Sequence, residues 1–266
     1  MTPLVRDALW QRLEPLLPSP PRRRFRFPGR KPLGCRKILT GILFVLTTGS
    51  ACDDLPADRG CGCGKTCRHD LRRWYPAGVW QQLHALLLAE RNGADQIDWS
   101  RALSDASFAK APEGGADTGP NPTDRGKSGS THHMLTDAHG IPLQAKVTAA
   151  TVNEVTRALD LLVNKPAVGG KPGPKRELPD RLQGDAGYDR APLRAWRRWL
   201  GSTPVLGKRG REHGRGLGKR RWFVERTISW LQSFGRWRRR LDRLTERQEA
   251  CLRLGCSLIC SRFLTP

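Results

Sequence analysis

The residues that follow Asn92–Gly93 change from helical to strand-like spacing, and this change constrains the fold more than any other feature of the sequence. Three short segments come next: ALSDASFA, THHMLTDA and PLQAKVTA. Each is rich in Thr, Val or Leu or alternates polar and apolar residues, as half-buried strands do. The second and third are joined at His139–Gly140, which suits a hairpin turn.

Helical spacing returns further along the chain, and one more short strand ends near Asp185. The expected helices span 153–163, 189–200, 222–234 and 243–262. Strands followed by alternating helix and strand predict a mixed α/β domain over the C-terminal two-thirds of the chain. The sequence contains no internal repeat.

The N-terminal part reads as short helices. Residues 4–17 place leucines near helical spacing until the segment PSPP interrupts the pattern, and residues 33–48 form an apolar helix. Residues 66–90 predict two helices with Trp74, Tyr75 and Trp80 interleaved with arginines. This pattern fits a helix-turn-helix-like DNA-binding module and equally an ordinary all-α cap. We therefore expect two domains, 1–90 and 91–266.

The charge balance points to a polyanionic partner. Lys and Arg number 47 against 25 Asp and Glu, a formal net charge of +22. Neutralising nucleic-acid phosphates supplies most of the affinity such proteins need, although a basic ribosomal or chromatin protein has the same balance. Residues 22–37 carry eight cations and no acid, which suits a phosphate-binding arm or, alternatively, a solvated linker.

The sequence also constrains the cellular compartment in which the protein is expected. No stretch reaches the roughly 18 consecutive apolar residues of a membrane span, and charge interrupts the first apolar run, so neither membrane association nor secretion is expected. Eight cysteines at irregular spacing fit a reducing cytoplasm. Cys52, Cys61, Cys63 and Cys67 match zinc knuckles poorly and are expected to be free thiols. We expect Cys251, Cys256 and Cys260 in the core.

Three acidic residues suggest metal-dependent phosphodiester chemistry. Asp185 follows Asp105 by 80 residues, and Glu225 follows Asp185 by 40. Carboxylates of this kind hold two divalent cations ~3.5–4 Å apart, which activate the attacking oxygen and stabilise the leaving one. Such oxygen ligands suit Mg²⁺ or Mn²⁺.

The helix that carries Glu225 has a readable face. Val224, Ile228 and Leu231 form an apolar stripe, and Arg221 lies beside Glu225 at helical spacing. A carboxylate on a packed helix is held accurately, as a metal site requires. The alternative is an ordinary salt bridge between Arg221 and Glu225, worth only ~0.3–0.5 kcal/mol.

Several basic residues are candidate DNA contacts. The GKS sequence at 126–128 lacks P-loop spacing, but Lys127, Arg125 and nearby backbone amides suit a phosphate or a plain surface turn. Trp230, Phe234 and Trp237 are expected in the core, with the neighbouring arginines projecting outward. The full set of expected DNA-binding residues is Arg22, Arg23, Arg24, Arg26, Lys127, Lys208, Arg209, Lys219, Arg220, Arg221, Arg236 and Arg238. We expect no ligand role for His132 or His133.

Four segments in order carry a family resemblance: IDWSRALSDASFAKA, DTGPNPTDRGKSGSTHHMLTDAHGIPL, LQGDAGYD and RRWFVERTISWLQSF. They resemble the DDE transposases of bacterial insertion sequences, in the insertion sequence five group. The segments ALWQRLEPLLP, LTTGSACDDLP and YPAGVW resemble that group's N-terminal helical DNA-binding domain, so the resemblance covers nearly the whole chain.

The resemblance implies an RNase H-like fold with catalytic residues Asp105, Asp185 and Glu225. It places the first aspartate on a central strand, the second after a later strand and the glutamate on a helix, with Arg221 as the family arginine. The chain departs from the family pattern at Gly218, Gln232 and Cys52, where a tyrosine, a lysine or arginine, and a tryptophan are usual.

The resemblance implies a Mg²⁺- or Mn²⁺-dependent enzyme that binds the terminal inverted repeats of its element, cleaves the DNA ends and joins them to target DNA. Because two ends must meet, we expect a homodimer or larger assembly on double-stranded DNA. The alternatives are a catalytically decayed relic that only binds DNA and an RNase H-like nuclease that cuts without joining.

Overall fold

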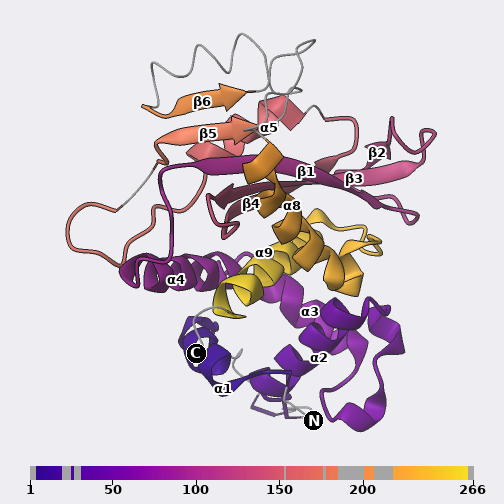
Figure 1. Cartoon of the computed structure of the whole chain (residues 1–266). Helices are drawn as coiled ribbons and strands as arrows, with labels where there is room; N and C mark the ends of the chain where they lie inside the picture. The colour runs from indigo at the N-terminus through magenta and orange to yellow at the C-terminus, as the bar shows by residue number, and fades with distance from the viewer. Residues whose placement is uncertain are drawn as a thin grey trace.

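A computed structural model describes residues 4–19, 25–26, 31–152, 154–175, 178–184, 201–206 and 218–262, without the side chains of 154–156, 204, 206 and 218–220. Its centre is a mixed sheet (Figure 1). The strands are β1 Ala102–Lys110, β2 Gly119–Pro120, β3 Ser128–Asp137, β4 Pro142–Ala149, β5 Arg181–Gly184 and β6 Thr203–Leu206. They lie in the order β4-β3-β1-β5-β6, and β2 pairs with the far end of β3.

The pairing directions define the fold class. Strands β1, β3 and β4 form an antiparallel meander, whereas β5 and β6 run parallel to β1. The central strand β1 therefore pairs with β3 on one side and β5 on the other. This arrangement confirms the predicted α/β, RNase H-like class and the predicted strands around Asp105 and before Asp185.

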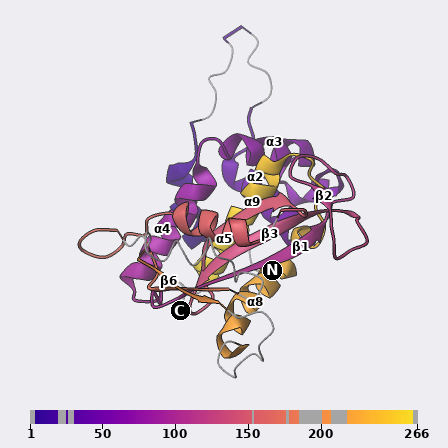
Figure 2. The same ribbon diagram turned by 90° about the horizontal axis from the view of Figure 1, so that it is seen from above.

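Helices cover both faces and one edge of the sheet. The helices are α1 Asp7–Leu13, α2 Cys35–Thr48, α3 Gly64–Trp74, α4 Val79–Gly93, α5 Glu154–Val163, α8 Gly218–Ser233 and α9 Thr245–Arg262. Helices α5 and α8 lie on opposite faces of the sheet (Figure 2). These helices confirm the expected ones at 153–163, 222–234 and 243–262, whereas 189–200 lies outside the described residues.

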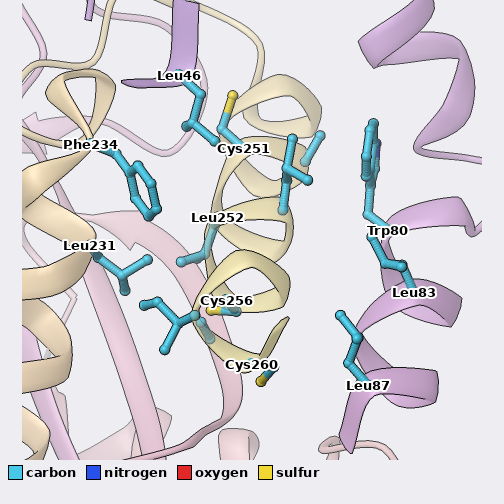
Figure 3. Packing of buried hydrophobic residues seen from close by; sticks show 14 of the residues in the cluster. Leu46, Trp80, Leu83, Leu87, Leu231, Phe234, Cys251, Leu252, Cys256 and Cys260 are labelled. Carbon is cyan, nitrogen blue, oxygen red and sulfur yellow. The ribbon is translucent and has the colours of Figure 1, made fainter. Parts of the chain in front are cut away.

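Helix α9 joins the two halves of the chain. It lies between the sheet and helices α3 and α4, and Cys251, Cys256 and Cys260 are buried on it as expected (Figure 3). Leu231 of α8 and Leu83 of α4 pack on either side. Burying apolar area on both sides of one helix makes a single core from both parts of the sequence.

The N-terminal helices pack on this core at several places: α1 contacts α4, α2 contacts the turn Gly235–Trp237, and α3 contacts α9. Much of α4 is buried, because Trp80, Leu83, Leu87 and Leu88 are inaccessible and His84 bonds to the Pro142 carbonyl of β4 at 2.8 Å. Arg91 donates to the Cys260 carbonyl of α9 at 2.9 Å. Helix α4 continues to Gly93, past the expected domain boundary at residue 90.

Candidate active site on strand β1 and helix α8

Asp105 lies on the central strand β1 and is 9% exposed. Its register partner on β3 is Met134. The Ala106 amide donates to Asp105 Oδ1 at 3.0 Å. A carboxylate buried this deeply requires a cationic partner or hydrogen bonds to offset its lost hydration.

Glu225 lies on α8, which packs across the sheet near β1 and β3. The predicted stripe is confirmed, because Val224 and Leu231 are buried and Ile228 is partly buried. The Glu225 side chain is 54% exposed at the edge of this stripe. A rigid helix therefore presents the carboxylate to solvent on the side of the sheet where Asp105 lies.

Arg221 connects the two carboxylates. Its Nε lies 3.0 Å from Glu225 Oε1, and its Nη2 lies 3.6 Å from Asp105 Oδ1. The first contact is the predicted helical salt bridge; the second joins α8 to β1. One guanidinium therefore holds two of the three predicted catalytic carboxylates in a single ion-pair cluster.

The β3–β4 turn fixes the position of α8. Thr227 Oγ1 donates to the Gly140 carbonyl, and Arg226 Nη2 donates to the His139 carbonyl at 2.5 Å. Gly140 has φ +88°, and a Cβ there would lie 2.8 Å from both the Phe223 carbonyl oxygen and Thr227 Oγ1. Only glycine permits this close approach, so the predicted His139–Gly140 turn also seats the helix that carries Glu225.

A buried carboxylate organises the same turn. Asp137 accepts hydrogen bonds from the amides of Asp98, His139 and Ile141 at 2.9, 3.0 and 2.7 Å. Burial raises the pKa of Asp137 to about 6, against the opposing effect of these amides. Sequence reasoning did not single out Asp137; its position one residue before a turn was the available signal.

An aromatic ladder on α8 was also missed. Arg226 lies over the rings of Trp222 and Trp230, 4.6 Å from each centroid, and 5.1 Å from that of Phe223. Trp222 is 45% exposed. The i, i+4, i+8 spacing of Trp222, Arg226 and Trp230 was the signal that could have found this stack.

The other predicted site residues have mixed outcomes. Asp185 directly follows β5 but lies outside the described residues, as do five of the predicted DNA contacts, Arg22, Arg23, Arg24, Lys208 and Arg209. Lys219 and Arg220 begin α8, where the side chains are not described. Arg26, Lys127 and Arg238 are exposed. In the turn at 121–127, the amides of Gly126 and Lys127 donate to Asn121 and Asp124 carbonyls, so they are not available to a phosphate.

The expectation that Arg236 faces DNA is wrong. Arg236 is 3% exposed and donates to Asp242 Oδ2 at 2.6 Å and to the Ser50 carbonyl at 3.3 Å. Arg240, also expected to project outward, is buried and donates to the Asp117 carbonyl at 3.0 Å. Helix α8 ends at Ser233, and the 3-10 turn Gly235–Trp237 breaks the helical phase from which the outward directions were inferred.

The core aromatic residues and the histidines have structural roles. Phe234 and Trp237 are buried as expected, and Trp230 is partly buried. His133 bonds to Thr148 Oγ1 at 2.8 Å, and His132 lies 3.1 Å from Gln248 Nε2. Burial lowers the pKa of His132 to about 3 and that of His133 to about 4.

Two further observations concern the described residues only. They contain no group of three His, Cys, Asp or Glu side chains placed to hold a metal ion, and Asp185 is outside this set. No helix among them has the length and apolar character needed to cross a membrane.

Comparison with known families matches both parts of the chain. Residues 5–84 match the family described as "Putative transposase of IS4/5 family", and residues 100–260 match the family "Transposase DDE domain". The second match contains Asp105, Asp185 and Glu225. Together the two matches leave only a short segment of the chain, 85–99, between them.

Individual relatives agree. The chain is 45% identical over 174 residues to the "Putative transposase for insertion sequence element IS402" of Burkholderia cepacia, covering 65% of this chain and 81% of that protein. It is 53% identical over 120 residues to the "Insertion element IS402 uncharacterized 16.2 kDa protein" of the same organism, covering 45% and 82%. A match to the Mos1 strand transfer complex (12% identity, TM-score 0.28, covering 87% and 80%) is too weak to add to the fold argument.

The sheet topology, the carboxylates on β1 and α8, and the family matches agree with one another. The chain belongs to the DDE transposase family of bacterial insertion sequences.

Proposed function

We propose that the protein is an active transposase that binds the terminal inverted repeats of its insertion sequence, cleaves the DNA ends and joins them to target DNA. The observation that carries this proposal is the meeting of Asp105 and Glu225 on one guanidinium at the centre of the DDE domain. Two carboxylates from elements 120 residues apart in the sequence are brought together where the family resemblance assigns the chemistry.

Asp185 completes the proposed catalytic set. The parallel register pairs Leu103 of β1 with Gln183 of β5, and β5 ends at Gly184. Asp185 is the next residue in the sequence and lies within the matched DDE domain, which supports its assignment together with Asp105 and Glu225.

The donor set fits a hard divalent cation. Asp105 and Glu225 offer carboxylate oxygens, the ligands that Mg²⁺ and Mn²⁺ prefer, and both already contact a positive charge. Asp105, Asp185 and Glu225 would hold the metal. When bound, it would activate the attacking oxygen and stabilise the leaving oxygen of the phosphodiester.

The chain's own residues prepare this site. Arg221 offsets the charge of the two carboxylates, so they stay close together at low cost. The turn at His139–Gly140 fixes α8, and with it Glu225, relative to the sheet. Carboxylates held on a strand and a docked helix lose little further freedom when the site assembles.

DNA contacts are proposed on basic surfaces on both sides of this centre. Lys127, Arg238 and Arg26 are exposed and suited to phosphate, together with the cations outside the described residues. End specificity is assigned to the N-terminal helices and phosphate affinity to the whole chain. Two DNA ends require a dimer or larger assembly.

A second candidate is a decayed transposase that only binds DNA. Gln232 stands where the family pattern has a lysine or arginine and Gly218 where it has a tyrosine, which favours this candidate. Gly218 is the first residue of α8, the helix of Glu225, and Gln232 lies near its end. A wild-type protein that binds the DNA ends without cleaving them would support this second candidate.

A strand-transfer assay tests the proposal. The probe is a duplex of the inverted repeat that flanks this gene, incubated with a supercoiled plasmid and Mg²⁺. We expect joined products with the wild-type chain and none with Asp105→Asn, while Glu113→Gln, an exposed carboxylate in the loop after β1, serves as the matched control. End cleavage without joining would instead identify a nuclease.

A further inference from the structure

A basic groove lies where the N-terminal ends of helices α2 and α3 converge. Its volume is about 970 Å³. We call it the α2–α3 groove; its lining residues are Lys31, Pro32, Leu33, Gly34, Arg36, Lys37, Thr40, Gly62, Cys63 and Thr66. None of these described lining residues is acidic, so the groove is an anionic-ligand site by charge.

Close packing fixes the two helices that form the groove. A Cβ on Gly41 of α2 would lie 2.5 Å from Cys67 Sγ of α3, and a Cβ on Gly64 would lie 1.5 Å from the Cys52 carbonyl oxygen. The Cys67 thiol donates to the Ile38 carbonyl of α2 at 3.7 Å. Glycine at position 41 lets α2 and α3 approach closely, and glycine at position 64 lets α3 approach the 3-10 turn Cys52–Asp54, so close packing sets the positions of the two helices.

The basic side chains at the groove differ in whether a neighbouring residue holds them in place. Arg36 pairs with Asp7 and lies 5.9 Å from the Trp10 ring centroid, which ties it to α1. Lys31 and Lys37 are exposed. Both belong to the acid-free basic segment at 22–37.

The outer face of α3 extends the positive surface. Lys65, Arg68, His69 and Arg72 share this face at i, i+3, i+4 and i+7. Arg68 pairs with Asp53 at 2.6 Å and Arg72 with Glu246 at 3.0 Å. The result is a basic helix face beside the groove, on which Lys65 and His69 are exposed.

The start of α2 also suits phosphate. Gly34, which precedes α2, has no side chain to cap that helix, whereas at the start of α3 the Cys63 thiol already lies 3.3 Å from the Thr66 hydroxyl. The first amides of a helix need acceptors, and phosphate oxygens serve well. This adds to the charge of Lys31 and Lys37 on the same side of the module.

We propose that the α2–α3 groove binds the phosphate backbone of the element-end duplex, with α3 as the helix that lies against the DNA. This rests on the proposed function and locates end binding within the N-terminal module. Helix α4, the other candidate in the helix-turn-helix-like prediction, exposes Gln82, Leu86 and Gly93 but no cation, because its Arg91 is buried. The recognition surface is α3, and α4 is its support.

The first test removes two exposed cations from the full chain. We compare wild type, Lys31→Gln with Lys37→Gln, and the matched control Lys175→Gln, an exposed lysine in the segment before β5. Each lost phosphate contact lowers the slope of log affinity against log salt by about 0.9, which is about fivefold in affinity at 0.15 M salt and roughly 30-fold for the pair. We expect this loss for the double variant and none for the control, by fluorescence anisotropy on the inverted-repeat duplex.

The second test uses Cys63 as a reporter inside the groove. All eight cysteines lie in the described part of the chain, and Cys63 alone is exposed. A hydrogen bond from the Thr66 hydroxyl and nearby amides lowers the pKa of its thiol, which favours alkylation. Saturating duplex should slow alkylation by N-ethylmaleimide at least tenfold, and Cys63→Ser gives the background rate.

The outcomes separate this inference from the proposed function. A wild-type protein that binds the duplex while Cys63 stays equally reactive and the double variant binds normally would overturn the groove assignment alone. If the duplex results were the same and the groove bound an acidic protein surface instead, its partner would be a protein and the groove assignment to DNA would be wrong. A wild-type protein that does not bind the duplex at all would overturn both.

Discussion

The guanidinium of Arg221 lies 3.6 Å from Oδ1 of Asp105 and thereby ties helix α8 to the central strand β1. Arg221 also holds Glu225 at 3.0 Å. The pairing brings a buried carboxylate and an exposed carboxylate to one positive charge. The stability of the site and its response to a divalent cation follow from this relationship.

Removing the arginine should destabilise the protein most when no metal is present. Arg221→Gln leaves the buried Asp105 carboxylate without this partner, at a cost of about 1–3 kcal/mol in the free energy of unfolding. Mg²⁺ should restore part of the loss, because a cation replaces the missing charge. Urea unfolding with and without Mg²⁺ measures both effects. Arg239→Gln, an exposed arginine outside the cluster, is the control, and an equal loss in both variants would contradict this role.

The close approach at Gly140 should matter more for cleavage than for DNA binding. Gly140→Ala adds a Cβ 2.8 Å from Thr227 Oγ1 at φ +88°, which should cost about 1–3 kcal/mol and displace α8. Gly60→Ala is the matched control, since Gly60 also has positive φ (+62°) but has open space around it. Cleavage and binding are measured for both. If both variants cleave equally, the Gly140 contact does not position Glu225.

Stability should fall as the pH is lowered from about 6.5 to 4. Burial lowers the pKa of His84 to about 4, of His132 to about 3 and of His133 to about 4. Near pH 6.5 the unfolded chain begins to bind protons at these histidines while the folded state does not, so a fall in pH favours unfolding. Each histidine contributes a slope of up to about 1.4 kcal/mol per pH unit. Asp137, with its pKa raised to about 6, opposes this, because its contribution is lost as the pH rises from 3.8 to 6.

Urea unfolding across this pH range tests the prediction. His84→Gln should reduce the pH slope of the free energy of unfolding, whatever it does to stability at pH 7. His69→Gln, at an exposed position, is the matched control. A slope that is the same for wild type and His84→Gln would show that His84 is not held neutral in the folded state.

Two nearby arginines should respond in opposite ways to the same substitution. Arg236→Gln removes one partner of the buried pair with Asp242 and should cost about 3–5 kcal/mol. Arg238→Gln removes an exposed charge, so it should leave stability within about 0.5 kcal/mol while weakening DNA binding. Thermal unfolding and anisotropy separate the two. If the Arg236→Gln protein were fully stable and bound DNA more weakly, Arg236 would be a DNA contact after all.

The features that the sequence could predict are those that depend on the local spacing of apolar residues. The strands around Asp105 and before Asp185 and the helix of Glu225 carry clear spacing of apolar residues, and the structure contains each of them. The salt bridge between Arg221 and Glu225 is likewise a local consequence of helical spacing. These features depend on neighbours within two turns of helix or along one strand.

The rest depends on tertiary contacts that periodicity does not contain. Nothing local indicates that Arg221 also reaches Asp105, 116 residues earlier, or that Gly140 seats α8. The inward direction of Arg236 follows from the end of α8 at Ser233, which apolar spacing through Phe234 and Trp237 concealed. The deep burial of Trp80, Leu83 and Leu87 on α4 follows from the return of α9, which is remote in sequence.

The most direct test of the account compares wild type and Asp185→Asn on a labelled duplex of the element end. The change keeps the size of the side chain and removes the charge that would hold a hard divalent cation. Binding and cleavage are recorded with Mg²⁺ and with Mn²⁺. We predict that the variant folds and binds the end at least as well as wild type, because fewer carboxylates repel one another, and that cleavage falls by several orders of magnitude. Cleavage by Asp185→Asn at the wild-type rate would contradict the assignment of Asp105, Asp185 and Glu225 as the catalytic carboxylates.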